Sequence, residues 1–476
     1  MKRILSSVVF TIIICICAQA QVPKPVVDER TELLSVVFRL VGAKEYVNNG
    51  VKTYDQTIDS LFAPFKDHEL IKYAIEIRKT NSIGYDAVMS FAINIEINDG
   101  KIDFRKNLSS GLESRWTEKS AAQFLEYLND FYTKSKFHEF YLSYKPLYLM
   151  AEERFTPLLD NVDFTWFEKF YGKKIDGNFH LILNMCNGGN NYGPNLIHND
   201  GREDLYSIMG LWQVDSLGNP VYPSRMVETV IHEYNHSYCN PLIDEFYPQM
   251  EKAVKPFYEL VTQKMQQQAY GNPITMMRET LVRASVIEYF IGKSIGNEVI
   301  KNAILREQMN GFLFVDTMVQ ALSDYEKQRD KYLSLRDYMP EIVKLINSLS
   351  YDEVYEKFAK NAVKITAVSI PNNADDVDPK TTELKITFSK PMDDRFRGLG
   401  YGKKGKDFMP EFEKDGKTPT WNEDKTEITF YSIILKPNTE YSLSIPSQFF
   451  RGKNADPVLE TYFLDFKTNH CSNLLK

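Results

Sequence analysis

The chain has 476 residues, of which 43% are hydrophobic and 13% aromatic, and its formal net charge at pH 7 is −7. This length exceeds one ordinary domain and the apolar content suffices for buried cores, so we expect a globular protein of several domains. An acidic chain without basic clusters gives no support for nucleic-acid binding, and no basic amphipathic stretch indicates binding to a membrane surface.

The N-terminus has the pattern of an export signal. A basic start is followed by apolar residues 4–17 and the cleavage site Ala18-Gln19-Ala20, so residues 1–20 are predicted to be a signal peptide. The apolar run is short for a membrane span and no later run reaches the required length, so we expect no membrane span. We therefore predict an exported protein, periplasmic or extracellular. A lipid anchor at Cys17 is less favoured, because the small residue usual before a lipobox cysteine is missing.

Three cysteines remain after the predicted signal peptide: Cys186, Cys239 and Cys471. Three cysteines make at most one disulfide, and their spacing is not that of a zinc site. For Cys186 and Cys239 we expect buried thiols.

The first half of the mature chain alternates helical patterns with polar breaks. Residues from Glu29 to Val41 carry apolar side chains at helical spacing and end at Gly42, a common helix C-cap, and Lys119 to Tyr132 predicts another helix. We assign residues 21–155 to a helical N-terminal subdomain.

Strand-like runs follow between about 156 and 215, including Phe179 to Met185 and Tyr206 to Val214. A helical block then extends from Ser224 to about Lys360. Strands followed by helices indicate an α+β domain, which we place at residues 156–362.

The helical block opens with an HExxH motif, His232-Glu233-Tyr234-Asn235-His236. Two histidines four residues apart project from the same helix face, so their imidazoles can converge on one Zn²⁺. The carboxylate of Glu233 is placed to take a proton from a zinc-bound water, as a zinc hydrolase requires.

The surrounding residues predict that the motif lies inside a helix. The helix has an apolar stripe that can pack against a core, and the two histidines and Glu233 lie off this stripe. Ser224 is a plausible N-cap and Pro241 cannot continue the helix, so we expect the helix to end near Asn240. The stripe consists of Val227, Ile231, Tyr234 and Tyr238.

Catalytic zinc keeps three protein ligands and one open position, so a third ligand is needed. The metzincin pattern would place glycine and histidine where the chain has Cys239 and Leu242, and that reading fails. The common alternative is a glutamate from a later helix. The run from Met276 to Phe290 is apolar nearly all round and contains two glutamates, Glu279 and Glu288.

Nine residues separate Glu279 from Glu288, about two and a half helical turns, so only one of them can face the metal. We choose Glu279, because Arg283 lies four residues on and can orient its carboxylate. Glu288 is the alternative ligand, while Asp244 and Glu245 are weaker candidates. An ordinary ion pair between Glu279 and Arg283, without any metal, is the competing interpretation.

In the last part of the chain the spacing of apolar residues changes from a helical period to a period of two. After Ala362, apolar residues alternate with polar ones in short runs separated by turn-rich segments, a pattern typical of a β-sandwich. We assign residues 363–470 to such a domain. The segment from Ile386 to Asp393 resembles the bacterial Ig-like domains appended to secreted and surface proteins, which serve as spacers or binding accessories.

The HExxH helix with a later glutamate resembles the gluzincin group of zinc metallopeptidases, which includes thermolysin and the M1 aminopeptidases. The chain is also similar to a family of secreted bacterial proteins known only as a domain of unknown function and regarded as zinc proteases. That likeness covers most of residues 28 to 360. Together these likenesses imply that residues 156–362 form a zincin-like metallopeptidase domain, with zinc ligands His232, His236 and Glu279 and with Glu233 as general base. The segments that carry the second likeness are residues 28–35, 187–193 and 279–284.

The chain also departs from known gluzincins. Neither the Asn-Glu-x-x-Ser-Asp segment of thermolysin nor the Gly-Ala-Met-Glu-Asn segment of M1 aminopeptidases is present, which leaves endo or exo cleavage open. In gluzincins an edge strand upstream of the motif usually pairs with an extended substrate. Residues 179–185 are either that edge or an ordinary core strand.

Two functions remain. The first is a zinc metallopeptidase that hydrolyses peptide bonds with Glu233 as general base. Its oxyanion donor is unassigned among Tyr192, Tyr289, Arg283 and His198. The second is a non-catalytic surface or adhesion protein with a structural or vestigial zinc site and an Ig-like binding module. Intact Glu233 favours the enzyme, because a structural site would have four protein ligands and no base.

Overall fold

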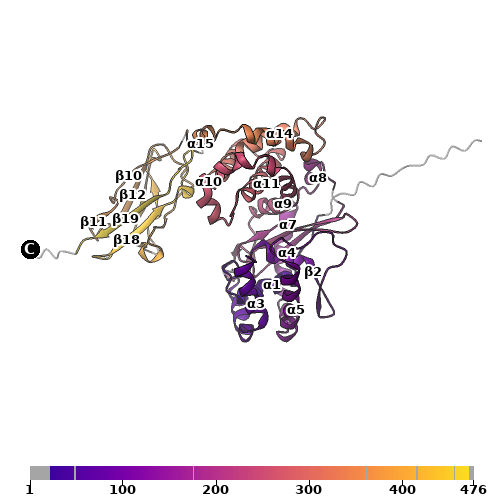
Figure 1. Ribbon diagram of the computed structural model, residues 1–476. Coiled ribbons are helices and arrows are strands. Elements are labelled where there is room, and N and C mark those ends of the chain that lie inside the picture. Colours follow the sequence, from indigo (N-terminus) through magenta and orange to yellow (C-terminus); the bar gives the residue numbers. More distant parts are fainter. Residues whose placement is uncertain are drawn as a thin grey trace, which may run out of the picture. The chain divides into compact units, whose positions relative to one another are not determined.

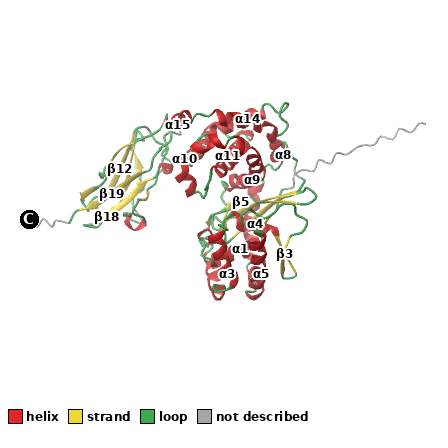
Figure 2. Ribbon diagram, in the orientation of Figure 1, coloured by secondary structure: helices red, strands yellow, loops and turns green. Residues whose placement is uncertain are grey.

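A computed structural model describes residues 22–47, 50–174, 176–360, 362–413, 416–454 and 456–470. The protein is a mixed α+β structure (Figures 1 and 2) that divides into two compact units. The first unit ends at Asn240 and includes residues 333–336, and the second contains the rest. The predicted signal peptide, residues 1–20, lies outside the described residues, as does Cys471.

The first unit contains helices before and around a central sheet. Its helices are α1 (Glu29–Leu40), α2 (Lys52–Leu61), α3 (Glu69–Thr80), α4 (Asp86–Asn94), α5 (Glu118–Lys134), α6 (Phe137–Ser143), α7 (Lys145–Leu159), α8 (Thr165–Tyr171) and most of α9 (Met226–Phe246). Its strands are β1 (Pro25–Val27), β2 (Ile95–Asn98), β3 (Lys101–Phe104), β4 (Phe179–Asn184), β5 (Asn191–Tyr192), β6 (Asn195–Ile197), β7 (Glu203–Gly210), β8 (Gln213–Val214) and β9 (Pro220–Val221).

The predicted helices near residues 29–41 and 119–132 correspond to α1 and α5. Asp28 caps the start of α1 by accepting a hydrogen bond from the Arg30 backbone at 2.9 Å. After the helix, Gly42 adopts φ +80° and donates to the Arg39 carbonyl. Glycine adopts this left-handed backbone conformation more easily than other residues, which explains why α1 ends here.

The central sheet combines parallel and antiparallel pairs. Strands β1, β4 and β7 are parallel in that spatial order, and the short strands β5 and β6 both pair antiparallel with the far side of β7. The predicted strand at residues 179–185 is therefore an internal core strand, and the edge beyond β7 is formed by β5 and β6. The second predicted strand is shifted: β7 covers Glu203–Gly210 and the chain turns before β8.

Helices cover both faces of this sheet (Figure 1). On one face, the Tyr234 ring of α9 meets Phe179 of β4 at 5.0 Å, and its hydroxyl donates to the His180 carbonyl at 2.9 Å. On the other face, Asn184 of β4 donates to Ser35 of α1 at 3.0 Å. Because side chains alternate along a strand, odd-numbered residues of β4 face α9 and even-numbered residues face α1.

The helix that carries the HExxH motif is longer than predicted. Its apolar stripe is buried, which confirms that face, but α9 continues through Pro241 to Phe246. The expectation that it would end near Asn240 is wrong. A proline inside a helix removes one hydrogen bond and costs about 3 kcal/mol. Complete burial of Cys239 and Ile243 on either side offsets this cost, because each buried apolar side chain contributes roughly 1.5–3 kcal/mol.

The second unit begins with a helical block. Its helices are α10 (Glu251–Gln267), α11 (Pro273–Gly292), α12 (Asn297–Met309), α13 (Val315–Glu326), α14 (Leu335–Ser348) and α15 (Tyr351–Ala359). Helix α11 starts at the N-cap Asn272, whose side chain accepts from the Thr275 backbone at 2.9 Å. Most residues of α11 are buried, as its all-round apolar sequence predicts.

The remaining residues of the second unit form two four-stranded sheets and the short pair β14-β17 (Figure 2). One has the spatial order β10-β12-β16-β15 and the other β11-β19-β18-β13. Alternate residues of β12, β16, β18 and β19 point into one shared hydrophobic core, as the period-two pattern predicts. The strands are β10 (Ile365–Val368), β11 (Ala374–Val377), β12 (Glu383–Phe388), β13 (Gly400–Tyr401), β14 (Glu411–Phe412), β15 (Thr420–Trp421), β16 (Glu427–Tyr431), β17 (Ile433–Ile434), β18 (Glu440–Ile445) and β19 (Tyr462–Thr468).

Cys186 and Cys239 are both buried thiols, as predicted. Within the part of the chain that the structure describes, no helix has the length and apolar character needed to cross a membrane.

Candidate metal centre

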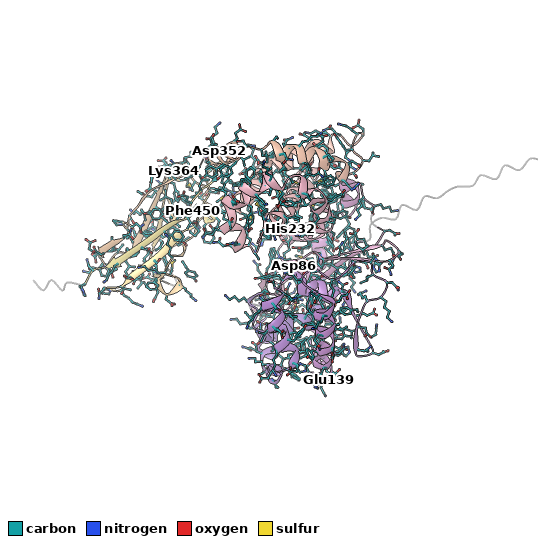
Figure 3. The ribbon with its side chains drawn as sticks, in the orientation of Figure 1. Asp86, Glu139, His232, Asp352, Lys364 and Phe450 are labelled. Carbon is teal, nitrogen blue, oxygen red and sulfur yellow. The ribbon has the colours of Figure 1, made fainter. Side chains whose placement is uncertain are left out.

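His232, labelled in Figure 3, and His236 lie one turn apart on α9, and their rings meet edge to face with centroids 4.8 Å apart. Their Nε2 atoms are 3.1 Å apart, and the ring planes cross at 82°. Two nitrogens bound to one tetrahedral Zn²⁺ at about 2.0–2.1 Å would lie about 3.3 Å apart. The histidine pair therefore has the spacing that two ligands of one zinc ion require.

Asn240 supports this arrangement from the next turn of α9. Its Oδ1 lies 3.3 Å from Nδ1 of His236. An oxygen at this position accepts a hydrogen bond from Nδ1–H and leaves the lone pair of Nε2 for a metal, the usual way in which a neighbouring group fixes a ligand histidine. The sequence signal was the spacing of four residues after His236, which our sequence analysis did not use.

Glu279 completes a group with His232 and His236, which we call the metal group. One ligand atom from each of His232, His236 and Glu279 lies within 4.8 Å of the others, and Glu279 is buried. Among the residues that the structure describes, no other group of three such side chains is this close. The structure thus brings together the three side chains that the sequence analysis selected as ligands.

The alternative ligands lie elsewhere in the second unit. The Glu288 carboxylate accepts a hydrogen bond from Ser323 of α13 at 2.7 Å, and burial raises its pKa. Asp244 instead pairs with Arg278 of α11. Neither these acids nor Glu245 belongs to the group formed with the histidines.

The three donors match zinc in kind and number. Two imidazole nitrogens and one carboxylate oxygen are typical of catalytic zinc, whereas Mg²⁺ and Ca²⁺ prefer all-oxygen sites. Three protein ligands also leave one tetrahedral position for water or substrate. The residues present therefore fit a zinc ion with an open coordination position.

Glu233 lies between the two histidines in sequence and is only 5% exposed. The segment after β5 passes directly over its backbone: a Cβ atom on Gly193 would lie 2.0 Å from the Glu233 carbonyl oxygen. Only glycine permits so close an approach. The edge strand β5 is thereby held against α9 at the motif itself.

The four candidates for an oxyanion donor differ in their surroundings. Tyr192 pairs with Ile208 of β7, which places it on the sheet face opposite α9. His198 is bonded to Asp204 at 2.8 Å, and Tyr289 is 1% exposed. Arg283 contacts Glu279 at 3.2 Å. Of the four, Arg283 has a described contact with a member of the metal group.

The segment that leads to β5 is anchored from beneath the sheet by Glu32 of α1. Its carboxylate accepts hydrogen bonds from the Met185 backbone at 2.5 Å and from the Tyr54 hydroxyl at 2.7 Å, and Tyr54 also bonds Tyr148 at 2.7 Å. Burial raises the pKa of Glu32 to about 7 although these hydrogen bonds lower it. Glu32, within residues 28–35, thus holds the backbone two positions before residues 187–193, another of the segments that carried the family resemblance.

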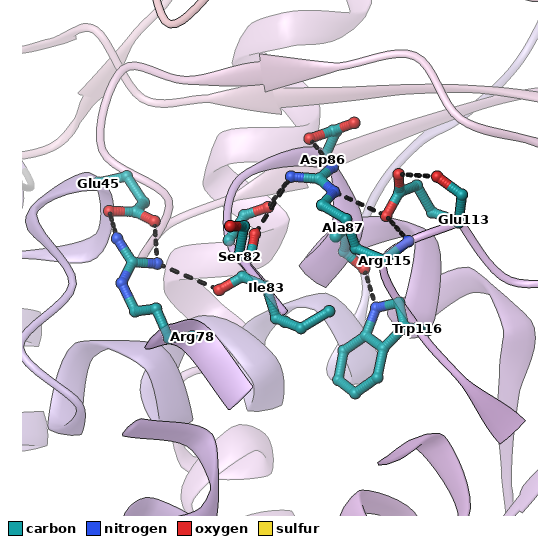
Figure 4. Close-up of polar contacts among 11 residues, drawn as sticks. Glu45, Arg78, Ser82, Ile83, Asp86, Ala87, Glu113, Arg115 and Trp116 are labelled. Atoms are coloured by element: carbon teal, nitrogen blue, oxygen red, sulfur yellow. Dashed lines mark hydrogen bonds and ion pairs between the residues drawn. The ribbon is translucent and has the colours of Figure 1, made fainter. Parts of the chain in front are cut away.

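A second anchored segment, residues 82–86, leads into the first residue of α4 (Figure 4). Arg78 pairs with Glu45 at 2.6 Å, while Arg115 pairs with Asp86 and donates to the Ser82 and Gly84 carbonyls. Tyr85 between them adopts φ +51°, a strained conformation for a tyrosine that neighbouring contacts must hold. These arginine pairs therefore fix the backbone of this loop.

Comparison with models of protein families shows to which family the chain belongs. Residues 26–345, more than half of the chain, match the family described as domain of unknown function (DUF4932). The chain belongs to the DUF4932 family. The family match includes every member of the metal group and Glu233. No curated protein matches the chain significantly.

Among solved structures, the chain is similar to the bacterial surface layer protein SbsC. Domains 1–6 of SbsC are 14% identical with a TM-score of 0.17, over 52% of this chain and 34% of that chain. The N-terminal part of SbsC is 15% identical with a TM-score of 0.17, over 54% of this chain and 60% of that chain. The chain thus spans less than two thirds of either SbsC chain. At this TM-score the likeness carries no argument about fold or function.

Proposed function

We propose that this DUF4932 protein is a gluzincin-type zinc metallopeptidase that hydrolyses peptide bonds. The observation that carries the proposal is the group formed by His232, His236 and Glu279, with Glu233 in the same motif. A structural zinc site would take a fourth protein ligand, whereas this group leaves a position open and its motif contains Glu233 as a candidate base.

The chemistry follows from the positions of these side chains. When bound, zinc would supply a water of lowered pKa and polarise the scissile carbonyl. Glu233 takes the proton from that water and then gives it to the leaving amine as the peptide bond breaks. Asn240 keeps His236 in the tautomer that presents Nε2, and Arg283 orients the Glu279 carboxylate.

The sheet supports a zincin-like arrangement for residues 156–362. Its edge beyond β7 is antiparallel to the other strands, precedes the motif in sequence and contacts α9 at Glu233. An edge strand in this place can pair with an extended peptide through backbone hydrogen bonds. We propose that β5 binds the substrate in this way.

The C-terminal strand order supports an Ig-like module at residues 363–470. In an Ig sandwich one sheet has the order A-B-E-D and the other contains C, F and G. Numbering β10, β12, β16 and β15 as A, B, E and D gives the first sheet, and β13, β18 and β19 as C, F and G gives the second. We propose that this module is an accessory of an exported enzyme whose signal peptide is residues 1–20.

The first test is the metal content of purified mature protein, residues 21–476. One equivalent of zinc is expected in the wild type, and loss of that zinc in His232→Ala, because two ligands and a water hold the ion poorly. Elemental mass spectrometry measures this directly. A folded wild-type protein that takes up no zinc would favour the non-catalytic surface protein instead.

The second test separates catalysis from metal binding. Glu233→Gln should keep one equivalent of zinc and lose peptide hydrolysis by at least about 10²-fold, because it removes the general base and none of the ligands. Cleavage of a mixed peptide library, read by mass spectrometry, gives the rate. Wild-type activity in this variant would overturn the assigned mechanism.

A further inference from the structure

We propose that Glu307, supported by Tyr270, sets how strongly Glu279 binds a metal by holding the positive charge of Arg283 away from it. This inference rests on the proposed zinc site and concerns residues that do not bind the ion themselves. Tyr270, Arg283 and Glu307 all belong to the second unit. They are positioning residues, and the contacts around Arg283 show how they act.

The Glu279 carboxylate already has a cationic partner. Its Oε2 lies 3.2 Å from Nη2 of Arg283, one turn further along α11. The hydroxyl of Tyr270 also bonds both Arg283, at 3.1 Å, and the Glu279 carboxylate. An arginine this close orients a ligand carboxylate, but it also competes with a metal ion for the same negative charge.

Glu307 draws the guanidinium in the other direction. Its Oε2 lies 2.7 Å from Nη1 of Arg283, closer than Glu279, and its side chain is 5% exposed. Glu307 is itself held by Arg306 at 3.0 Å and Asn310 at 3.3 Å. A buried carboxylate fixed in this way keeps Arg283 from turning fully toward Glu279.

The rest of the Arg283 environment keeps it in place. The guanidinium lies over the Phe312 ring at 4.4 Å, and its side chain is 17% exposed. Buried charges need partners on every side that water does not reach. Because Arg283 is shared between two carboxylates, Glu279 is oriented by it without being neutralised.

The decisive variant is Glu307→Gln in the mature protein. It keeps the shape of the side chain and removes the charge that balances Arg283, so Arg283 would pair with Glu279 alone. The affinity for zinc should fall about 10- to 100-fold, the usual effect of changing a group that supports a metal ligand. Competition with a chromophoric chelator measures the affinity of the metal alone, without a substrate.

Glu288→Gln is the matched control. Glu288 lies on the same helix as Glu279, is equally buried at 6%, and is bonded to Ser323. Its loss should leave zinc affinity unchanged. Tyr270→Phe, which removes one hydroxyl and little packing, should weaken zinc binding a few-fold and provides a second measurement if Glu307→Gln fails to fold.

The double variant Arg283→Gln with Glu307→Gln tests the charge argument. Removing the competing cation should restore part of the affinity that Glu307→Gln loses. Equal affinity in wild type and a folded Glu307→Gln would overturn this inference alone, as would a double variant no better than Glu307→Gln. Failure of the wild-type protein to bind zinc would overturn the proposed function as well.

Discussion

Glu32 is an acid that the fold holds entirely away from water, at the end of β4. It anchors the segment that leads to β5 while its pKa is raised by burial to about 7. In the unfolded chain the same acid titrates near 4.5. Between these two values the folded state retains a proton that the unfolded state has lost, so stability falls as pH rises.

The first prediction concerns this pH dependence. The contribution of Glu32 should be fully present below pH 4.5 and lost as pH rises through about 7, a change of about 3 kcal/mol. Glu32→Gln keeps an acceptor for the Met185 backbone and cannot ionise, so it should be more stable than wild type at pH 8. Urea unfolding at pH 5 and pH 8 measures the difference. An unchanged pH dependence in Glu32→Gln would mean that other groups cause it.

The sequence predicts the histidines of the metal group well and its acid less well. A spacing of four residues on one helix places His232 and His236 together whatever the rest of the fold does. The choice between Glu279 and Glu288 depends on how α11 packs, because helical spacing says only that the two differ in direction. Glu307 lies on a different helix from either, so no local pattern could relate it to Arg283.

At the scale of elements, the close approach of β5 to α9 is the feature that joins sheet and motif. Gly193 is the contact point, and the atoms that a side chain would meet there belong to the Glu233 backbone. A backbone cannot move aside as the end of a flexible side chain can. The spacing between strand and helix is therefore set by the absence of a side chain.

The second prediction follows from this contact. Gly193→Ala should push β5 away from α9, reducing peptide hydrolysis at least about tenfold, since an ångström of misplacement in a site is costly. Gly111→Ala is the control, because nothing lies within 4 Å of the added atom. Hydrolysis rates and melting temperatures of both variants provide the comparison. Full activity in Gly193→Ala would show that this edge of the sheet does not position substrate.

Elements were predicted best where one periodic pattern acts alone. The helices α1 and α5 and the strands of the C-terminal sheets follow from apolar spacing. The end of α9 did not, because Pro241 is a local stop signal that burial of the following turn overrides. The edge strand of the central sheet could not be predicted from apolar spacing either, because β5 has only two residues.

At the scale of the whole molecule, the strands after residue 363 build a hydrophobic core from their own side chains. A core of this kind does not need the helices that precede it. This agrees with the change of sequence period near Ala362 and with the proposal that these strands form an Ig-like accessory module.

The third prediction is that the mature chain cut after Ala362 still folds and binds zinc. Every member of the metal group, and its supporting residues, lies before that point. The zinc content and the chelator-measured affinity should match those of the uncut chain within about twofold. Aggregation or loss of zinc in the shortened chain would show that the last strands stabilise the part of the chain that carries the metal group.

The position of Glu32 also determines when the metal centre can form during folding. Its bond to Met185 joins residues 153 positions apart, and β1 must find β4 across a similar length of chain. Closing so long a loop is entropically costly, and contacts of high sequence separation form slowly. The helices before the sheet can collapse early, but the strand that rests on Glu233 is ordered only after this closure. The proposed peptidase activity would thus be acquired among the last events of folding.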